Sequence, residues 1–246
     1  MDRMLYIAMT GARETMRSQA VNTNNLANAS TTGFRADMES FLSLPLYGPG
    51  FPDRVYAAAD GAGVDLSGGT IQSTGRELDV AVKGEGWIAV QAPDGGEAYT
   101  RAGDLRVDSF GILTTGAGHP VLGEGGPIAV PPNGKLDIGA DGTITVQPLG
   151  QGVNALAIVD RIKLVNPPAA SLTKGEDGLI RLRNGAQAEA DAVVKLVSGA
   201  LESSNVNTVD SMVRMIELAR QFETQVKMMK TAEENDAAAA KLMNMS

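Results

Sequence analysis

Few side chains in this chain have the types and the spacing that catalysis requires. The single histidine, His119, stands between Gly118 and Pro120, a context typical of a turn, and the sequence contains no cysteine. A serine–histidine–acid triad would have to use this histidine, but no nucleophile-elbow motif accompanies it. We therefore predict neither nucleophilic catalysis nor a metal site built on thiolates.

Three short motifs resemble parts of chemical sites without their companions. The stretch Ser171–Lys174 matches S-x-x-K, but the partner motifs of that enzyme class are missing. The stretch Asp137–Gly142 lacks the alternating ligands and the final glutamate of a calcium loop. The glycines of 123–126 run into Pro127, with no helix start to hold a phosphate. We predict no enzyme, no cofactor, no metal and no small-molecule substrate.

Charge and hydropathy exclude further classes of protein. The chain has 246 residues, 21 basic and 29 acidic, for a net charge of −8. No basic run is present to meet phosphates, so we predict no nucleic-acid partner. The apolar run Leu5–Met9 is ended by Thr10 and Gly11, which is too short for a cleaved secretory signal. The protein therefore either stays in the cytoplasm or leaves by a route that cleaves no signal.

The chain divides into three parts, and the first part is predicted to be a helix. Leu5, Met9, Ala12 and Met16 are spaced four, three and four residues apart, which places one narrow apolar seam on a helix. Polar residues at 28–33, ending in Gly33, predict where this helix stops. Such a seam either packs within its own domain or contacts other helices, and the sequence leaves both open.

The middle part, roughly 60 to 199, has the two-residue alternation of strands. Apolar residues alternate at Leu78/Val80/Val82, Leu105/Val107, Leu136/Ile138, Ile144/Val146, Ile162/Leu164 and Ile180/Leu182, and a strand over 87–90 joins them. The turn signals between them are Asp94-Gly95, Asn133-Gly134, Asp141-Gly142, Asp177-Gly178 and Asn184-Gly185, pairs that tolerate positive φ. Short strands with frequent turns predict an antiparallel sandwich or barrel-like domain.

The last part of the chain is predicted to form a long helix, from Val206 to about Met245, because it contains neither proline nor glycine. Asn207, Thr208 or Asp210 is suited to cap its start. Its heptad seam consists of Met212, Met215, Ala219, Phe222, Val226 and Met229. This seam needs a partner, and the simplest arrangement packs the two terminal helices on each other and on copies from neighbouring subunits.

The expected fold is mainly β with long terminal α-helices: an antiparallel β domain is inserted between N- and C-terminal helices that pair as a coiled coil. We expect residues 1–30 plus 205–246 to form a terminal helical assembly domain and residues 60–204 a β-rich outer domain. Proline and glycine gather between Pro45 and Pro52, so residues 31–59 are expected to be an irregular connector.

Three segments, taken in order along the chain, resemble the signatures of a known protein family. Residues Asn24–Phe34 are similar to the N-terminal signature of flagellar axial proteins, which are the rod, hook and hook-associated proteins. Leu78–Trp87 with Tyr99–Gly103 resembles their core domain, and Gly199–Asn207 with Met212–Ile216 resembles their C-terminal signature. The resemblance implies a structural subunit of the bacterial flagellar basal-body rod.

Within this family the opening Met1–Tyr6, the tryptophan at Trp87 and the chain length favour the proximal rod. A distal rod subunit is the alternative, followed by a secreted β-domain binding module. The resemblance implies export through the flagellar export apparatus without a cleaved signal peptide. It also implies helical assembly around a channel across the periplasm, and transmission of torque from motor to hook. The implied partners are other copies, neighbouring proximal and distal rod subunits, and the export apparatus.

The expected subunit interface combines both seams with the signature amides. Asn24, Asn25 and Asn28 have two readings, hydrogen bonds across helices or simple helix-end chemistry, because amides both donate and accept. The full set of expected interface residues is Leu5, Met9, Ala12, Met16, Asn24, Asn25, Leu26, Asn28, Met212, Met215, Ala219, Phe222, Val226 and Met229.

Overall fold

The computed structural model describes residues 4–45, 55–148 and 157–243. The chain divides into two compact units. Unit 1 comprises residues 1–27, 37–65 and 206–246, and unit 2 comprises residues 28–36 and 66–205. Among the described residues, no helix is both long and apolar enough to cross a membrane.

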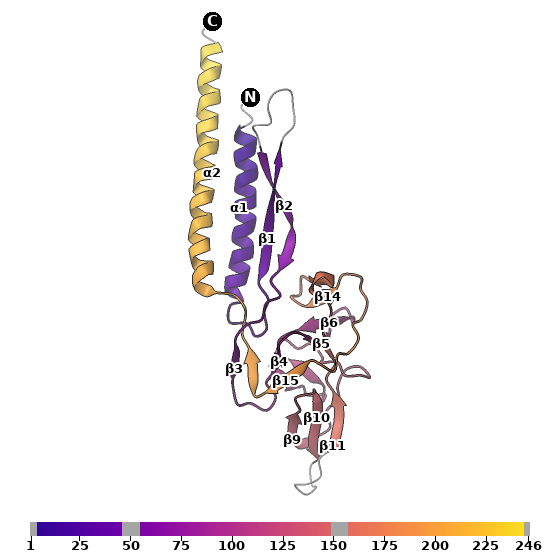
Figure 1. Cartoon of the computed structure of the whole chain (residues 1–246). Coiled ribbons are helices and arrows are strands. Elements are labelled where there is room, and N and C mark those ends of the chain that lie inside the picture. The colour runs from indigo at the N-terminus through magenta and orange to yellow at the C-terminus, as the bar shows by residue number, and fades with distance from the viewer. Residues whose placement is uncertain (1–3, 46–54, 149–156, 244–246) are drawn as a thin grey trace. The chain divides into compact units, whose positions relative to one another are not determined.

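Unit 1 is built from both ends of the chain. Helix α1 (Met4–Ala27) packs against helix α2 (Thr208–Met243) and against the hairpin of β1 (Asp37–Pro45) and β2 (Val55–Val64) (Figure 1). Helix α1 ends before the polar run as predicted, and Gly33 beyond it has a φ of 66°. The side chain of Asn207 caps α2, because its Oδ1 accepts the main-chain N–H of Val209 at 3.0 Å. The predicted packing of the terminal helices is confirmed.

The β1–β2 hairpin replaces part of the irregular connector expected over 31–59. The two strands are antiparallel from Asp37 opposite Val64 to Pro45 opposite Val55, with a bulge between Glu39 and Phe41. The proline- and glycine-rich residues 46–54 lie outside the described residues. The expected connector is therefore wrong for the strands on either side of these residues.

Unit 2 is β throughout, as expected, and every strand pair is antiparallel. Its largest sheet has the order β12-β5-β6-β14-β13, a second sheet has the order β11-β10-β9, and the pairs β15–β4, β16–β3 and β7–β8 complete it (Figure 1). The bounds are β3 (Ile71–Ser73), β4 (Val80–Lys83), β5 (Trp87–Gln91), β6 (Glu97–Thr100), β7 (Leu105–Val107), β8 (Leu113–Thr115), β9 (Asn133–Ile138), β10 (Thr143–Pro148), β11 (Ala157–Arg161), β12 (Leu164–Val165), the 3₁₀ turn η1 (Ala169–Ser171), β13 (Leu172–Lys174), β14 (Ile180–Leu182), β15 (Lys195–Ser198) and β16 (Ala200–Glu202).

Most of the predicted turns are confirmed by their backbone angles. Gly95, Gly142, Gly178 and Gly185 all have positive φ. The turn predicted at Asn133-Gly134 is wrong: strand β9 begins at Asn133, which pairs with Pro148. An Asn-Gly pair tolerates a turn but does not force one where a neighbouring strand is available to pair with it.

One aliphatic core holds unit 2 together. Its fully buried side chains come from both sheets and from the small strand pairs, including Val80, Ile88, Leu105, Leu113, Ile128, Ile144 and Ile162. Of these, Val80, Leu105 and Ile144 belong to the alternation read from the sequence and point inward, because successive side chains on a strand point to opposite faces.

A buried ionic cluster joins the two chain segments that enter and leave unit 2. Arg35 and Arg101 donate to opposite oxygens of the Glu202 carboxylate, at 2.6 and 2.8 Å. Both guanidiniums lie over the ring of Trp87, 5.6 and 5.3 Å from its centre. Burial lowers the pKa of the Arg101 guanidinium, and Glu202 opposes that effect. The main chain adds bonds from Gly33 to the oxygen of Glu202 and from Asn205 to the oxygen of Phe34.

Candidate assembly interface

The face of α1 that is buried in unit 1 is made of small and polar side chains. Its buried residues are Ala8, Ala12, Glu14, Thr15, Ser18 and Asn22. Of the predicted α1 seam, only Ala12 belongs to this face. Leu5, Met9 and Met16 are 38%, 53% and 57% exposed. Small side chains let α2 approach closely, and the large apolar residues remain on the surface of the subunit.

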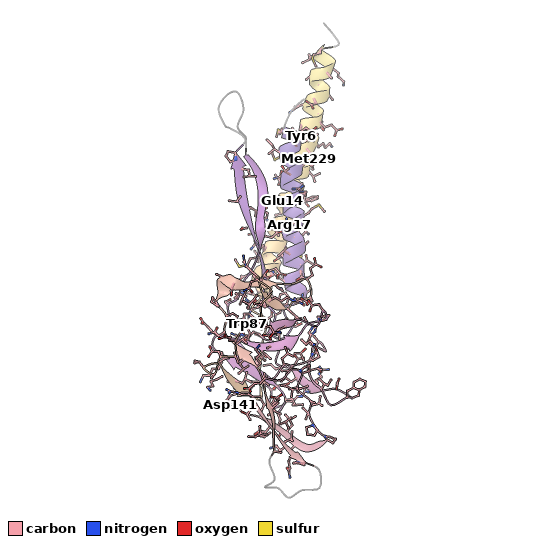
Figure 2. All side chains as sticks on the ribbon, turned by 90° about the vertical axis from the view of Figure 1, so that its right-hand side faces the viewer. Tyr6, Glu14, Arg17, Trp87, Asp141 and Met229 are labelled. Carbon is pink, nitrogen blue, oxygen red and sulfur yellow. The ribbon has the colours of Figure 1, made fainter. Side chains whose placement is uncertain are left out.

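The most buried residues of α2 are not all the ones that were predicted. The observed seam is rotated about the axis of α2 relative to the predicted seam. Its more buried residues follow a heptad spacing: Ser211, Met215, Leu218, Phe222, Gln225, Met229 and Ala232. The predicted residues Met215, Phe222 and Met229 belong to this seam, and Figure 2 labels Met229 on α2.

The remaining predicted α2 positions lie beside this seam. Met212 and Val226 are exposed and Ala219 is half-buried. Positions one residue apart on a helix differ by about 100°, so these side chains lie toward another side of α2. The predicted seam therefore spans two sides of the helix, one of which is the more exposed.

The signature amides have separate roles. Asn25 holds the start of β1, since its Nδ2 donates to the oxygen of Asp37 and its Oδ1 accepts the N–H of Asp37, both at 2.8 Å. Asn28 performs helix-end chemistry, accepting from Thr31 at 3.1 Å. Asn24 is exposed and Leu26 is half-buried on α1.

The amide that bonds across the helices is one that sequence reasoning missed. Asn22 Nδ2 donates to the main-chain oxygen of Ser211 at 2.8 Å. Asn22 lies four residues after Ser18 and seven after Thr15. A search for small and polar residues at helical spacing, in addition to apolar ones, would have found it.

The hairpin packs on α1 through ions and hydroxyls. The Glu39 carboxylate is paired with Arg17 at 2.8 Å and accepts from Ser18 at 2.9 Å. Figure 2 shows Arg17 on α1. Apolar residues of β1 are exposed, namely Met38, Phe41, Leu42 and Leu44. Unit 1 thus combines polar internal contacts with exposed apolar side chains on α1, α2 and β1.

The residues with possible chemistry are not brought together. The main chain of His119 closes a turn, because its oxygen accepts the N–H of Thr115 and its N–H donates to the Thr115 hydroxyl. Ser171 donates to the oxygen of Pro168 and Lys174 to that of Arg35, so each serves the main chain. The described residues contain no group of three His, Cys, Asp or Glu side chains that could hold a metal ion.

The motif over Asp137–Gly142 proves to be a hairpin turn. The Asp141 carboxylate accepts from the hydroxyl and the N–H of Thr143, and these hydrogen bonds lower its pKa. Figure 2 labels Asp141. The turn interpretation that the sequence favoured is the one the structure has.

Three family models match the chain in order along the sequence. Residues 5–35 match the flagella basal body rod protein, residues 81–146 the D1 domain of the flagellar hook protein FlgE/F/G, and residues 197–242 the C-terminal region of the flagellar basal body rod FlgEFG protein. The first and last matches cover nearly all of α1 and α2 and extend into unit 2, and the middle one falls within unit 2.

Full-length relatives agree with these models. The chain is 44% identical to the flagellar basal-body rod protein FlgF of Escherichia coli K12 and to that of Salmonella typhimurium LT2, over 100% of each chain. It is 31% identical to the rod protein FlgG of Bacillus subtilis, over 94% of this chain and 96% of that protein.

Proposed function

The chain belongs to the flagellar basal-body rod FlgE/F/G family, and from this premise we propose how it works in the rod. As a member of this family it is a structural subunit of the flagellar basal-body rod and not an enzyme. Its place is the basal-body rod, where it assembles with other rod subunits.

We place the chain in the proximal part of the rod, where it polymerises around the export channel and transmits torque from motor to hook. Two FlgF proteins that match over their whole length at 44% identity support this position over the distal one, since the FlgG match is at 31%. Its specific neighbours would be further copies and the proximal and distal rod subunits. It would reach them through the flagellar export apparatus, without a cleaved signal peptide.

One observation supports a role in polymerisation most directly. Several large apolar residues of α1 and α2 are exposed, although the helices already pack on each other. Met9, Met16, Met212 and Ile216 are each more than half exposed. Burying apolar surface is worth about 25 cal/mol per Å², so neighbouring subunits that cover these residues would stabilise the assembly.

We propose that the terminal helices are the part of the subunit that assembles and that the β-rich part is the domain they carry. Among the expected interface residues, those on the exposed sides of the helices would meet neighbours directly: Leu5, Met9, Met16, Asn24, Met212 and Val226. The half-buried Met215, Phe222 and Met229 would reach both α1 and a neighbour. Methionine suits such unlike contacts because its side chain is flexible and polarisable.

Deletion and complementation in the bacterium that encodes the chain test this function. Loss of the chain should abolish swimming, and the full chain should restore it. The double variant Met9→Asp, Met212→Asp should be made and exported but absent from purified basal bodies. A matched variant of unit 2, Phe110→Asp, also replaces an exposed apolar residue and should still enter basal bodies. Normal swimming without the chain would overturn the proposal.

A further inference from the structure

A groove in unit 1 contains a carboxylate whose charge is only partly compensated. The groove has a volume of about 620 Å³ and lies between α1, β1 and α2. Glu14 of α1 lines it and is 5% exposed (Figure 2). Its Oε1 accepts from the neighbouring Arg13, whereas its Oε2 has no hydrogen-bond partner among the described residues. A buried charge without full compensation is costly, so the groove is suited to a cation.

The rest of the groove is acidic with apolar walls. Asp210 and Glu217 of α2 line it together with Glu14, and Arg214 is the one basic residue in its lining. Phe41 of β1 and Val213 of α2, both exposed apolar residues, supply the walls. A complementary partner would carry basic side chains next to apolar ones.

Helix α2 carries such a surface on the side away from α1, which we name the outer stripe. The outer stripe consists of Val209, Met212, Ile216, Arg220, Glu223, Lys227 and Lys230, spaced three or four residues apart, and all of them are exposed. Its first half is apolar. Its second half carries three basic residues and one acidic residue, and none of those basic residues forms an ion pair within the described residues.

We propose that the acidic groove of one copy receives the outer stripe of α2 from a second copy. The α2 residues that line the groove and those of the outer stripe lie on different sides of α2. One subunit can therefore receive a neighbour in its groove and offer its outer stripe to another neighbour. A contact between unlike surfaces that does not close into a ring produces an open helical polymer. The acidic groove and the basic half of the outer stripe carry opposite charges, which favours this partner. These charges also fix how the stripe is aligned in the groove, because other alignments would bring like charges together. The inference rests on the proposed function and specifies one contact within it.

Cysteine cross-linking in basal bodies tests this contact without background, because the native chain has no cysteine. Gln221 lines the groove and Glu223 belongs to the outer stripe; both are exposed. Gln221→Cys and Glu223→Cys are produced as separate chains in one cell, and purified basal bodies are oxidised. The expected result is a disulfide-linked dimer that contains one chain of each kind, whereas cells with either chain alone should give no dimer.

Charge variants extend the test. Glu14→Gln combined with Glu217→Gln, in the Gln221→Cys chain, should lower the cross-linked fraction several-fold. Glu234→Gln, at an exposed position outside the groove lining, should leave that fraction unchanged.

The possible failures can be told apart. If both cysteine chains are in basal bodies of swimming cells and no mixed dimer forms, the groove contact is wrong and the rod function stands. A conjugate between Gln221→Cys and a different rod protein, identified by mass spectrometry, would also overturn the proposed partner. If neither chain enters basal bodies, the proposed function itself fails.

Discussion

The two units of this chain use their apolar residues in opposite ways. Unit 2 buries them: Ile88, Leu113 and Ile144 are fully enclosed in one aliphatic core. Unit 1 buries mostly alanines and polar side chains, with Leu218 as its one buried large apolar residue among those described, and leaves Met9, Met16 and Met212 more than half exposed. From this difference we propose that unit 2 is complete within one molecule, whereas unit 1 uses its exposed apolar surface in contacts with neighbouring subunits.

The largest effect is expected at the ionic cluster of unit 2. Glu202→Gln leaves two buried guanidiniums facing a neutral amide, and breaking a buried ion pair costs about 3–5 kcal/mol. The free energy of unfolding of the full chain is measured in denaturant by the fluorescence of Trp87, its single tryptophan. Glu124→Gln, at an exposed position, is the control. Equal stability of the two variants would show that the cluster does not secure unit 2.

The next prediction compares apolar truncations in the two units. Ile144→Ala removes a fully buried side chain and should destabilise the monomer by about 2–5 kcal/mol. Met212→Ala removes an exposed one and should change monomer stability by less than about 0.5 kcal/mol. Denaturant titrations followed by circular dichroism measure both. In cells, Met212→Ala should lower the amount of chain in basal bodies. A large loss of monomer stability from Met212→Ala would contradict the comparison.

We expect the stability of unit 2 to depend on pH. Burial raises the pKa of Tyr99 from 10.0 to about 12, with the Glu97 carboxylate nearby also raising it. A raised pKa contributes stability that is complete below pH 10 and is lost as the pH rises through 12. The loss is on the order of 2–3 kcal/mol, since one pKa unit corresponds to about 1.4 kcal/mol. Unfolding free energies at pH 9, 10 and 11 measure about half of this loss, because pH 11 lies midway between the two pKa values. Tyr99→Phe should flatten this dependence, and an unchanged slope in that variant would assign the loss to other groups.

The smallest effect is expected where the helices of unit 1 meet. Ala8 of α1 is fully buried and Ala20 is exposed. Ala8→Leu should overpack the contact with α2 and cost about 1–2 kcal/mol. Ala20→Leu should be nearly neutral, because alanine and leucine have similar helix propensities. Thermal melts followed at 222 nm measure both, and equal melting temperatures would mean that α1 does not use the Ala8 face.

Much of the fold could be predicted from the sequence because it depends on local patterns. Alternation placed Val80, Leu105 and Ile144 in strands, and the Asp-Gly turns followed from the backbone freedom of glycine. The helix ends at Ala27 and Asn207 followed from capping chemistry. Strands β1 and β2 do not follow from the sequence, because the prolines and glycines between Pro45 and Pro52 predict an irregular connector over 31–59.

The packing of the terminal helices could be predicted only in part, for a physical reason. Apolar spacing identifies positions that need burial but does not say which molecule buries them. Ala12 is buried and Met215 and Phe222 are half-buried within the chain, whereas Met9 and Met212 remain exposed. The polar contacts of unit 1, such as Asn22 with Ser211, leave no apolar signal.

Limited proteolysis of the dilute monomer, with the fragments identified by mass spectrometry, tests the central claim most directly. If unit 1 is incomplete without neighbouring subunits, protease should cut within α1 and α2 first and leave a resistant fragment near residues 66–205. Resistance of both helices at enzyme concentrations that leave this fragment intact would contradict the account, because unit 1 would then be as complete in one molecule as unit 2.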